Sequence, residues 1–127
     1  MVRVLIADKM STSAMEVFKD RGVDVDVITG LSKDELIKII PEYDGIAIRS
    51  STTADADVFA AAKNLKVIGR AGIGVDNIDR KAATAKGVVV MNTPFGNAVT
   101  TAEHAITLLL SCARQIPAAS KRTQVGE

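Results

Sequence analysis

The sequence predicts an α/β fold in which short parallel strands alternate with helices. Apolar, β-branched runs recur as far as residue 92, and segments with helix-capping or helix-forming residues separate them. The first run, at residues 2–7, is apolar throughout, which is typical of a strand buried on both faces of a parallel sheet. This alternation favours a doubly wound, flavodoxin-like layer of five parallel strands over a barrel or an α+β fold.

Five segments carry the strand pattern. They are residues 2–7, 23–28, 45–50, 66–70 and 87–92. The second of them, VDVDVI, alternates acidic and apolar residues with a period of two. One face of this segment therefore suits solvent, and we expect it to form an edge strand. Right-handed crossovers between the strands would place helices on both faces of the sheet.

Helices are predicted between and after the strands. Three of them begin with a capping box, in which a hydroxyl and a Glu three residues later bind each other's backbone amides. These boxes pair Ser13 with Glu16, Ser32 with Glu35, and Thr100 with Glu103. The expected helices span residues 13–21, 33–40, 55–63, 76–86 and 101–116, and Pro41 closes the second.

The last predicted helix is apolar on most of its surface, with its polar side chains on one narrow stripe. Such a helix needs burial on most sides, and few residues follow Ile116. We therefore expect a truncated chain, with one domain over residues 1–98 and a linker helix over residues 99–127 that leads to an absent domain. A second copy would then cover Leu108, Leu109 and Ile116 and form a homodimer. The alternative is that the helix packs on the sheet of its own domain.

Composition excludes several classes of partner. Sixteen Lys and Arg oppose fifteen Asp and Glu, so the net charge of +1 favours no nucleic acid. No apolar run approaches the roughly 20 residues of a membrane helix, which predicts a soluble protein without a membrane partner. Cys112 is the only cysteine, so neither an internal disulfide nor a multi-cysteine metal site is expected. A reducing, cytoplasmic setting fits this composition.

The candidate binding residues follow the predicted strands, because open parallel sheets bind ligands at the carboxyl ends of their strands. Arg49 and Arg70 end two neighbouring runs, and Gly72, Ile73 and Gly74 follow the second. Two guanidinium groups beside exposed backbone amides describe a receptor for a small anion, either a carboxylate or a phosphate. The competing interpretation is that each Arg pairs with a nearby acid on the surface.

Other candidate chemistries have weaker support. Residues 72–77 fail the dinucleotide pattern GxGxxG, because Asn77 stands at the third glycine. Asp76 and Asp79 suit helix caps better than metal ligands, so no metal is expected. Ser50, Ser51 and His104 lack the partners that nucleophilic or acid–base catalysis would need. A phosphoacceptor receiver with Asp8 is also weak, because Arg49 occupies the place of the acceptor carboxylate.

Three separated motifs carry a family resemblance, and together they cover most of the chain from about residue 43 to 124. They are IRSSTTADADVF, VIGRAGIGVDNIDRKAATAKGVVVMNTP and GNAVTTAEHAITLLLSCARQIP. They resemble the N-terminal part of the D-2-hydroxyacid dehydrogenases. The resemblance implies a substrate-binding domain that precedes an NAD-binding Rossmann domain, with the long helix crossing between them.

The same resemblance assigns roles to individual residues. Those expected to bind a small phosphorylated hydroxy acid are Arg49, Ser50, Arg70, Gly72, Ile73, Gly74 and Asn97. Ile73 and Thr101 would touch the nicotinamide end of NAD, which the absent domain would mainly hold. The family's dinucleotide fingerprint and catalytic residues are missing, so no catalytic residue is assigned and the chain is expected to be inactive alone. The alternatives are a family member acting on glycerate or hydroxypyruvate, and a free-standing small-anion module.

Overall fold

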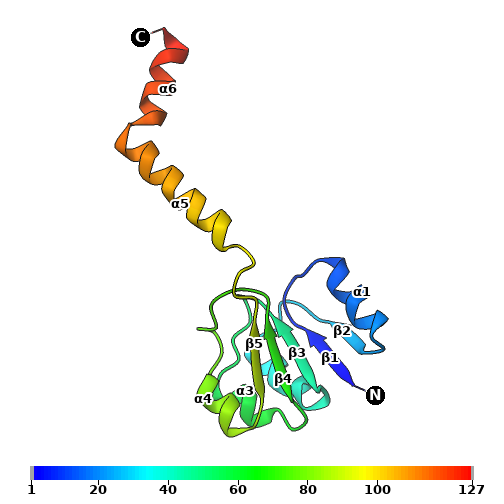
Figure 1. The fold of residues 1–127 in the computed structure, drawn as a ribbon. Helices are drawn as coiled ribbons and strands as arrows, with labels where there is room; N and C mark the ends of the chain where they lie inside the picture. The colour runs from blue at the N-terminus through cyan, green and yellow to red at the C-terminus, as the bar shows by residue number, and fades with distance from the viewer. Residues whose placement is uncertain (1, 127) are drawn as a thin grey trace. The chain divides into compact units, whose positions relative to one another are not determined.

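The computed structural model describes residues 2–126 and confirms the predicted five-stranded parallel sheet (Figure 1). The strands are β1 (Arg3–Ile6), β2 (Asp24–Val27), β3 (Gly45–Ile48), β4 (Val67–Arg70) and β5 (Val89–Asn92). Their order is β2-β1-β3-β4-β5, and every neighbouring pair is parallel. This is the flavodoxin-like order, and β2, with its alternating sequence, lies at an edge as predicted.

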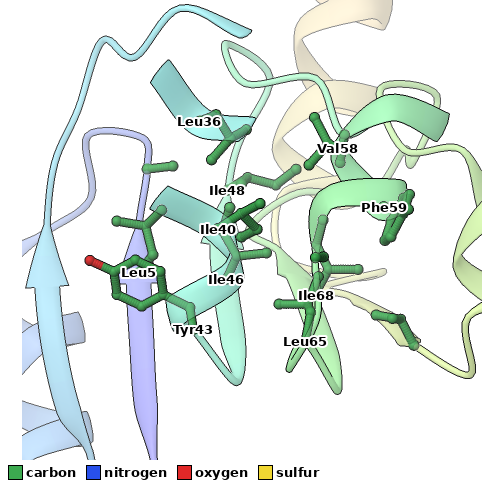
Figure 2. Close-up of a cluster of buried hydrophobic side chains, with 14 of the residues drawn as sticks. Leu5, Leu36, Ile40, Tyr43, Ile46, Ile48, Val58, Phe59, Leu65 and Ile68 are labelled. Atoms are coloured by element: carbon green, nitrogen blue, oxygen red, sulfur yellow. The ribbon is translucent and has the colours of Figure 1, made fainter. Parts of the chain in front are cut away.

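Helices lie on both faces of the sheet. These are α1 (Thr12–Asp20), α2 (Lys33–Ile39), the short 3-10 helix η1 (Ile40–Glu42), α3 (Ala56–Ala61) and α4 (Arg80–Ala85) (Figure 1). Two further helices, α5 (Ala98–Ala113) and α6 (Ile116–Val125), follow β5 in the chain. Helices α2, α3 and α4 cover one face, where the buried cluster lies (Figure 2). Its largest fully buried members include Phe59, Leu5, Leu36, Ile48 and Ile68. Helix α1 contacts β2 and contributes no buried residue.

Side-chain hydrogen bonds set several helix starts. The Ser32–Glu35 capping box is confirmed, because the Glu35 amide donates to Ser32 Oγ at 3.4 Å and the Ser32 amide donates to Glu35 at 2.8 Å. The Ser13–Glu16 box is wrong. Helix α1 begins at Thr12 after Ser11, whose side chain makes no cap hydrogen bond.

The fourth helix starts later than predicted, at Arg80 instead of residue 76. The reason is that Asp79 is the N-cap, and its carboxylate accepts the amide of Ala82 at 3.0 Å. Residues 71–79 therefore form a loop at the carboxyl end of β4. The prediction that Asp79 caps this helix is correct, whereas Asp76 lies in the loop.

The C-terminal helical segment departs from the prediction in two ways. Helix α5 begins at Ala98 with Asn97 as N-cap and no side-chain cap, so the Thr100–Glu103 box is wrong. The helix also ends at Ala113, and Gln115 adopts a left-handed conformation with φ of 50° before α6 starts at Ile116. Pro117 explains this break, because a proline lacks the N–H for the helical hydrogen bond and clashes with the carbonyl four residues earlier.

The chain divides into two compact units, Met1–Pro94 and Phe95–Glu127. The first holds the sheet with α1 to α4. The second holds α5 and α6, and no residue of either helix is buried. The assignment of residues 1–98 and 99–127 to separate functions stays a prediction. Over the described residues, no helix has both the length and the apolar character to cross a membrane.

Asp26 on β2 gives the folded sheet a measurable dependence on pH. The Tyr43 hydroxyl donates to Asp26 at 2.9 Å and the Arg3 guanidinium at 2.8 Å, and these bonds hold the pKa of Asp26 below its ordinary value of 3.8. The resulting stabilisation is present above pH 3.8 and is lost as the pH falls below it, because the unfolded chain takes up the proton first.

We therefore expect Asp26→Asn to make the free energy of unfolding less dependent on pH below about 4. Urea unfolding measured at a series of acidic pH values checks this. The matched control is Asp24→Asn, because Asp24 is exposed on the same strand. Equal slopes for the two variants would contradict the role of Asp26.

Candidate anion-binding site

The carboxyl ends of β3, β4 and β5 lie at one edge of the sheet. In the strand register Ile48 is opposite Arg70, and Arg70 is opposite Asn92. Arg49 follows Ile48 directly, so the register brings Arg49, Arg70 and Asn92 to the same edge. The strand order reverses beside it, because β2 and β3 lie on opposite sides of β1. Ligands of open α/β sheets bind at such a reversal.

Buried Asp8, at the end of β1, shapes the loop that carries Arg49. Its side chain is 4% exposed, and its Oδ2 accepts the backbone N–H of Arg49 at 2.5 Å and that of Thr52 at 3.2 Å. Its Oδ1 accepts the Thr52 hydroxyl at 2.7 Å. A carboxylate removed from water needs such partners. Both of its oxygens thus hold the loop, which gives Asp8 a structural role.

Arg49 is exposed, and its guanidinium donates to the carbonyl of Lys9 at 3.1 Å. It lines a cavity of about 480 Å³ together with Lys9, Met10, Ser11, Ala14 and Ala71. Within residues 2–126, no carboxylate forms an ion pair with Arg49. Lys9, which also lines this cavity, has no ion pair in the described residues either. Two positive charges without a carboxylate partner favour an anionic ligand in this cavity.

Arg70 is half-buried, and its Nε donates to Asn77 Oδ1 at 3.0 Å. It lines a second cavity of about 420 Å³, and Met10 and Ala71 line both cavities, so the two hollows adjoin. Across the part of the chain that the structure describes, Arg70 has no carboxylate partner either. The competing interpretation, in which each Arg is neutralised by a nearby acid, is therefore wrong.

The loop over residues 72–74 follows β4 and contacts the carboxyl end of β5. The Thr93 amide donates to the Gly72 carbonyl at 2.9 Å, and Asn92 Nδ2 donates to the Ile73 carbonyl at 2.7 Å. Among the described residues, no acceptor is found for the amides of Ile73 and Gly74. Successive free amides in such a loop can bind a carboxylate or phosphate.

Gly72 leaves room for the Arg70 guanidinium. A Cβ atom at Gly72 would lie 2.0 Å from Arg70 Nη1, so any other residue would displace this guanidinium. The glycine is thus explained by the close approach of a charged side chain.

The remaining sequence-predicted residues are Ser50, Asn97 and Thr101. Ser50 is exposed in the loop after β3. Asn97 and Thr101 belong to the second unit, so their predicted contacts with substrate and NAD stay predictions. Sequence reasoning placed Asp8 and Asn92 at strand ends but did not identify the loops that they hold, and it missed the site role of Asn77, which only its hydrogen bonds reveal. Within residues 2–126 no three His, Cys, Asp or Glu side chains gather as a metal site.

The family is decided by comparison with known proteins. A model of the D-isomer specific 2-hydroxyacid dehydrogenase catalytic domain matches residues 4–125. The chain belongs to this family. The resemblance drawn from the three motifs is therefore confirmed. The sheet edge that carries Arg49 and Arg70, called the arginine edge below, lies within the region that this catalytic-domain model matches.

Relatives within the family share a specific name. A D-3-phosphoglycerate dehydrogenase of Archaeoglobus fulgidus is 51% identical over 126 residues, which is 99% of this chain and 24% of that protein. The Sus scrofa protein of the same name is 45% identical over 125 residues, covering 98% of this chain and 24% of that protein. The chain thus spans about a quarter of the length of the curated relatives it matches.

Solved structures share the fold of this chain. A Pyrococcus horikoshii protein is 32% identical with a TM-score of 0.88, covering 100% of this chain and 38% of its own. A 3-phosphoglycerate dehydrogenase of Entamoeba histolytica with bound NAD+ is 30% identical with a TM-score of 0.76, covering 87% of this chain and 38% of its own.

The contact between Gly72 and Arg70 predicts a binding defect in this dehydrogenase-family chain. Gly72→Ala should displace the Arg70 guanidinium and weaken the binding of a small anion such as inorganic phosphate about tenfold, the size expected for one lost charged hydrogen bond. Calorimetric titration measures the affinity, and the melting temperature should change little. Gly69→Ala on β4 is the matched control, because its added Cβ would meet nothing within 4 Å. Equal affinities for the two variants would contradict the prediction.

Proposed function

We propose that this chain is the substrate-binding part of an NAD-dependent D-3-phosphoglycerate dehydrogenase. Such an enzyme oxidises 3-phosphoglycerate to 3-phosphohydroxypyruvate, the entry to serine biosynthesis. Relatives of this name are 43–51% identical to the chain. The observation that carries the proposal is the pair of unneutralised arginines on one sheet edge, because this substrate carries negative charge at both ends.

Different groups of the site would bind different parts of the substrate. The amides of the 72–74 loop would bind the carboxylate, while Arg49 and Arg70 would hold the anionic ends in a fixed direction. A guanidinium presents planar pairs of donors that match carboxylate and phosphate oxygens. Holding both ends orients the hydroxyl-bearing carbon between them, which lowers the entropy cost of the reaction.

Only two residues of this chain would approach NAD. Ile73 is 42% exposed beside the glycine loop, and it would touch the nicotinamide end through its main chain or by packing, whereas Thr101 would do so from the second unit. NAD, when bound, supplies the acceptor for hydride. The dinucleotide site and the groups that take up the hydroxyl proton would lie in the rest of a longer protein, so residues 1–127 alone would be inactive.

Two other functions remain as outcomes of the test. One is a related dehydrogenase of the glycerate or hydroxypyruvate type. A glyoxylate/hydroxypyruvate reductase of Sinorhizobium meliloti shares the fold at 25% identity, well below the relatives named D-3-phosphoglycerate dehydrogenase. The other is a free-standing anion receptor. It would bind a phosphorylated hydroxy acid tightly, whereas a half-cleft that leaves the ligand in water should bind weakly.

The activity is tested in the longer protein that carries this chain. We expect NAD-dependent oxidation of 3-phosphoglycerate, and we expect Arg49→Met to raise its KM at least about tenfold through lost charge-assisted hydrogen bonds. The KM for NAD should stay unchanged. Arg21→Met is the matched control, because Arg21 is exposed at the end of α1. Preferential turnover of unphosphorylated D-glycerate would identify the related dehydrogenase instead.

We also propose that the protein is a homodimer through α5. This helix leaves large apolar side chains in solvent, with Leu108 52%, Leu109 67% and Ile116, at the start of α6, 53% exposed. An exposed apolar surface of this kind is typical of an interface between copies.

Light scattering of the longer protein checks the proposed dimer. Leu109→Asp should shift it towards a monomer, because a charge buried at an apolar interface loses its hydration. Thr107→Asp on the polar stripe of the same helix is the control and should leave the dimer intact. A monomeric unsubstituted protein at high concentration would contradict the proposal.

A further inference from the structure

We propose that Asn77 is a positioning residue for the two-arginine site, and this inference rests on the proposed function. One side chain connects both arginine segments. Its Oδ1 accepts the Nε–H of Arg70 at 3.0 Å, and its Nδ2 donates to the carbonyls of Arg49 at 2.7 Å and Thr52 at 2.6 Å. Asn77 therefore holds the loop after β3 and the guanidinium at the end of β4 in one arrangement.

The chemistry of the partners determines the orientation of this amide. Two backbone carbonyls can only accept hydrogen bonds, and the Nε–H of an arginine can only donate. With the amide reversed, its oxygen would face two carbonyl oxygens and its NH₂ group would face another donor. The observed orientation satisfies both hydrogens and the oxygen of the side chain, so few other residues could replace it.

Asp8 and Asn77 bind the same loop, one through its backbone N–H groups and the other through its backbone carbonyls. Asp8 accepts the backbone N–H groups of Arg49 and Thr52, whereas Asn77 donates to the carbonyls of those same two residues. Every backbone polar group of Arg49 and Thr52 is thus bound to one of these two side chains. The base of the Arg49 side chain is therefore fixed before any ligand arrives.

The Nε bond leaves the outer nitrogens of Arg70 for a ligand. Within the described range, neither Nη1 nor Nη2 of Arg70 donates a hydrogen bond, and Nη1 lies over Gly72. Asn77 thus restrains the inner edge of the guanidinium plane while the outer donors stay available. A side chain already held in one conformation loses less entropy when it binds an anion.

The backbone of Asn77 is held independently of its side chain. Its carbonyl accepts the amide of Ala54 at 2.9 Å, and the Asp79 amide donates to the Ala54 carbonyl at 2.9 Å. These bonds form a parallel bridge between Ala54 and Ile78, which are both buried. Substitution of the side chain should therefore leave this bridge and the fold in place.

The first test compares two Asn77 variants in the longer protein that carries this chain. Asn77→Ala removes all three side-chain bonds, while Asn77→Asp keeps an acceptor for Arg70 but cannot donate to the two carbonyls. Both should raise the KM for 3-phosphoglycerate about tenfold, as the loss of charged or buried hydrogen bonds predicts. The KM for NAD should stay within about twofold, on the same energetic scale.

Asn64→Ala is the matched control. Its amide also donates to a backbone carbonyl, that of Pro41 at 2.8 Å, but it lies away from both arginines. Its melting temperature should fall about as much as that of the Asn77 variants, while its KM for 3-phosphoglycerate should not change. Asn77 variants with an unchanged KM for an active enzyme would overturn the proposal and leave the proposed function intact.

A second measurement does not depend on turnover. In protein labelled with ¹⁵N-arginine, the Arg70 Nε–H signal should be resolved, and Asn77→Ala should move it to the position of a free guanidinium. Asn77→Asp should retain a bonded signal. An unchanged Arg70 signal in Asn77→Ala overturns the proposal whatever the kinetics. If the unsubstituted protein does not oxidise 3-phosphoglycerate, the proposed function fails, and this signal still decides the role of Asn77.

Discussion

The parallel register of β3, β4 and β5 is the constraint on which the site depends. Because these strands end at the same level, Arg49, Arg70 and Asn92 meet at one edge although they are far apart in sequence. The buried cluster on one face of the sheet, which includes Phe59 and Ile68, stabilises this register. The apolar core thus positions the charged residues at this edge without contacting a ligand itself.

Arg49 and Arg70 differ in their partners from the basic side chains that form ion pairs. Three basic side chains are held by carboxylates: Arg3 by Asp26 and Glu42, Lys33 by Asp55 and Asp57, and Lys66 by Asp44. Over residues 2–126, Arg49 and Arg70 instead bind neutral oxygens, from Lys9 and Asn77. A neutral acceptor orients a guanidinium without cancelling its charge, so the attraction for an anion persists.

The two units pose different physical problems. The sheet unit buries its own core and presents a site, whereas α5 and α6 bury no residue. A helix without a core of its own is stabilised by packing against other parts of a protein or against a second copy. The relatives named D-3-phosphoglycerate dehydrogenase are about four times as long as this chain, so they contain further residues against which such helices could pack. The exposed leucines of α5 and the arginine edge are thus two separate binding surfaces on one short chain.

The sequence by itself determined the fold class, the edge position of β2, the Ser32–Glu35 box and the strand-end positions of Arg49 and Arg70, because periodicity, capping and strand ends are local properties. It misjudged the starts of α1, α4 and α5, whose N-cap residues are Ser11, Asp79 and Asn97, and it missed the break before Pro117. Only the tertiary structure showed that Asn77 joins both arginine segments, since this depends on contacts 25 and 28 residues apart. No local pattern encodes a hydrogen bond between distant loops.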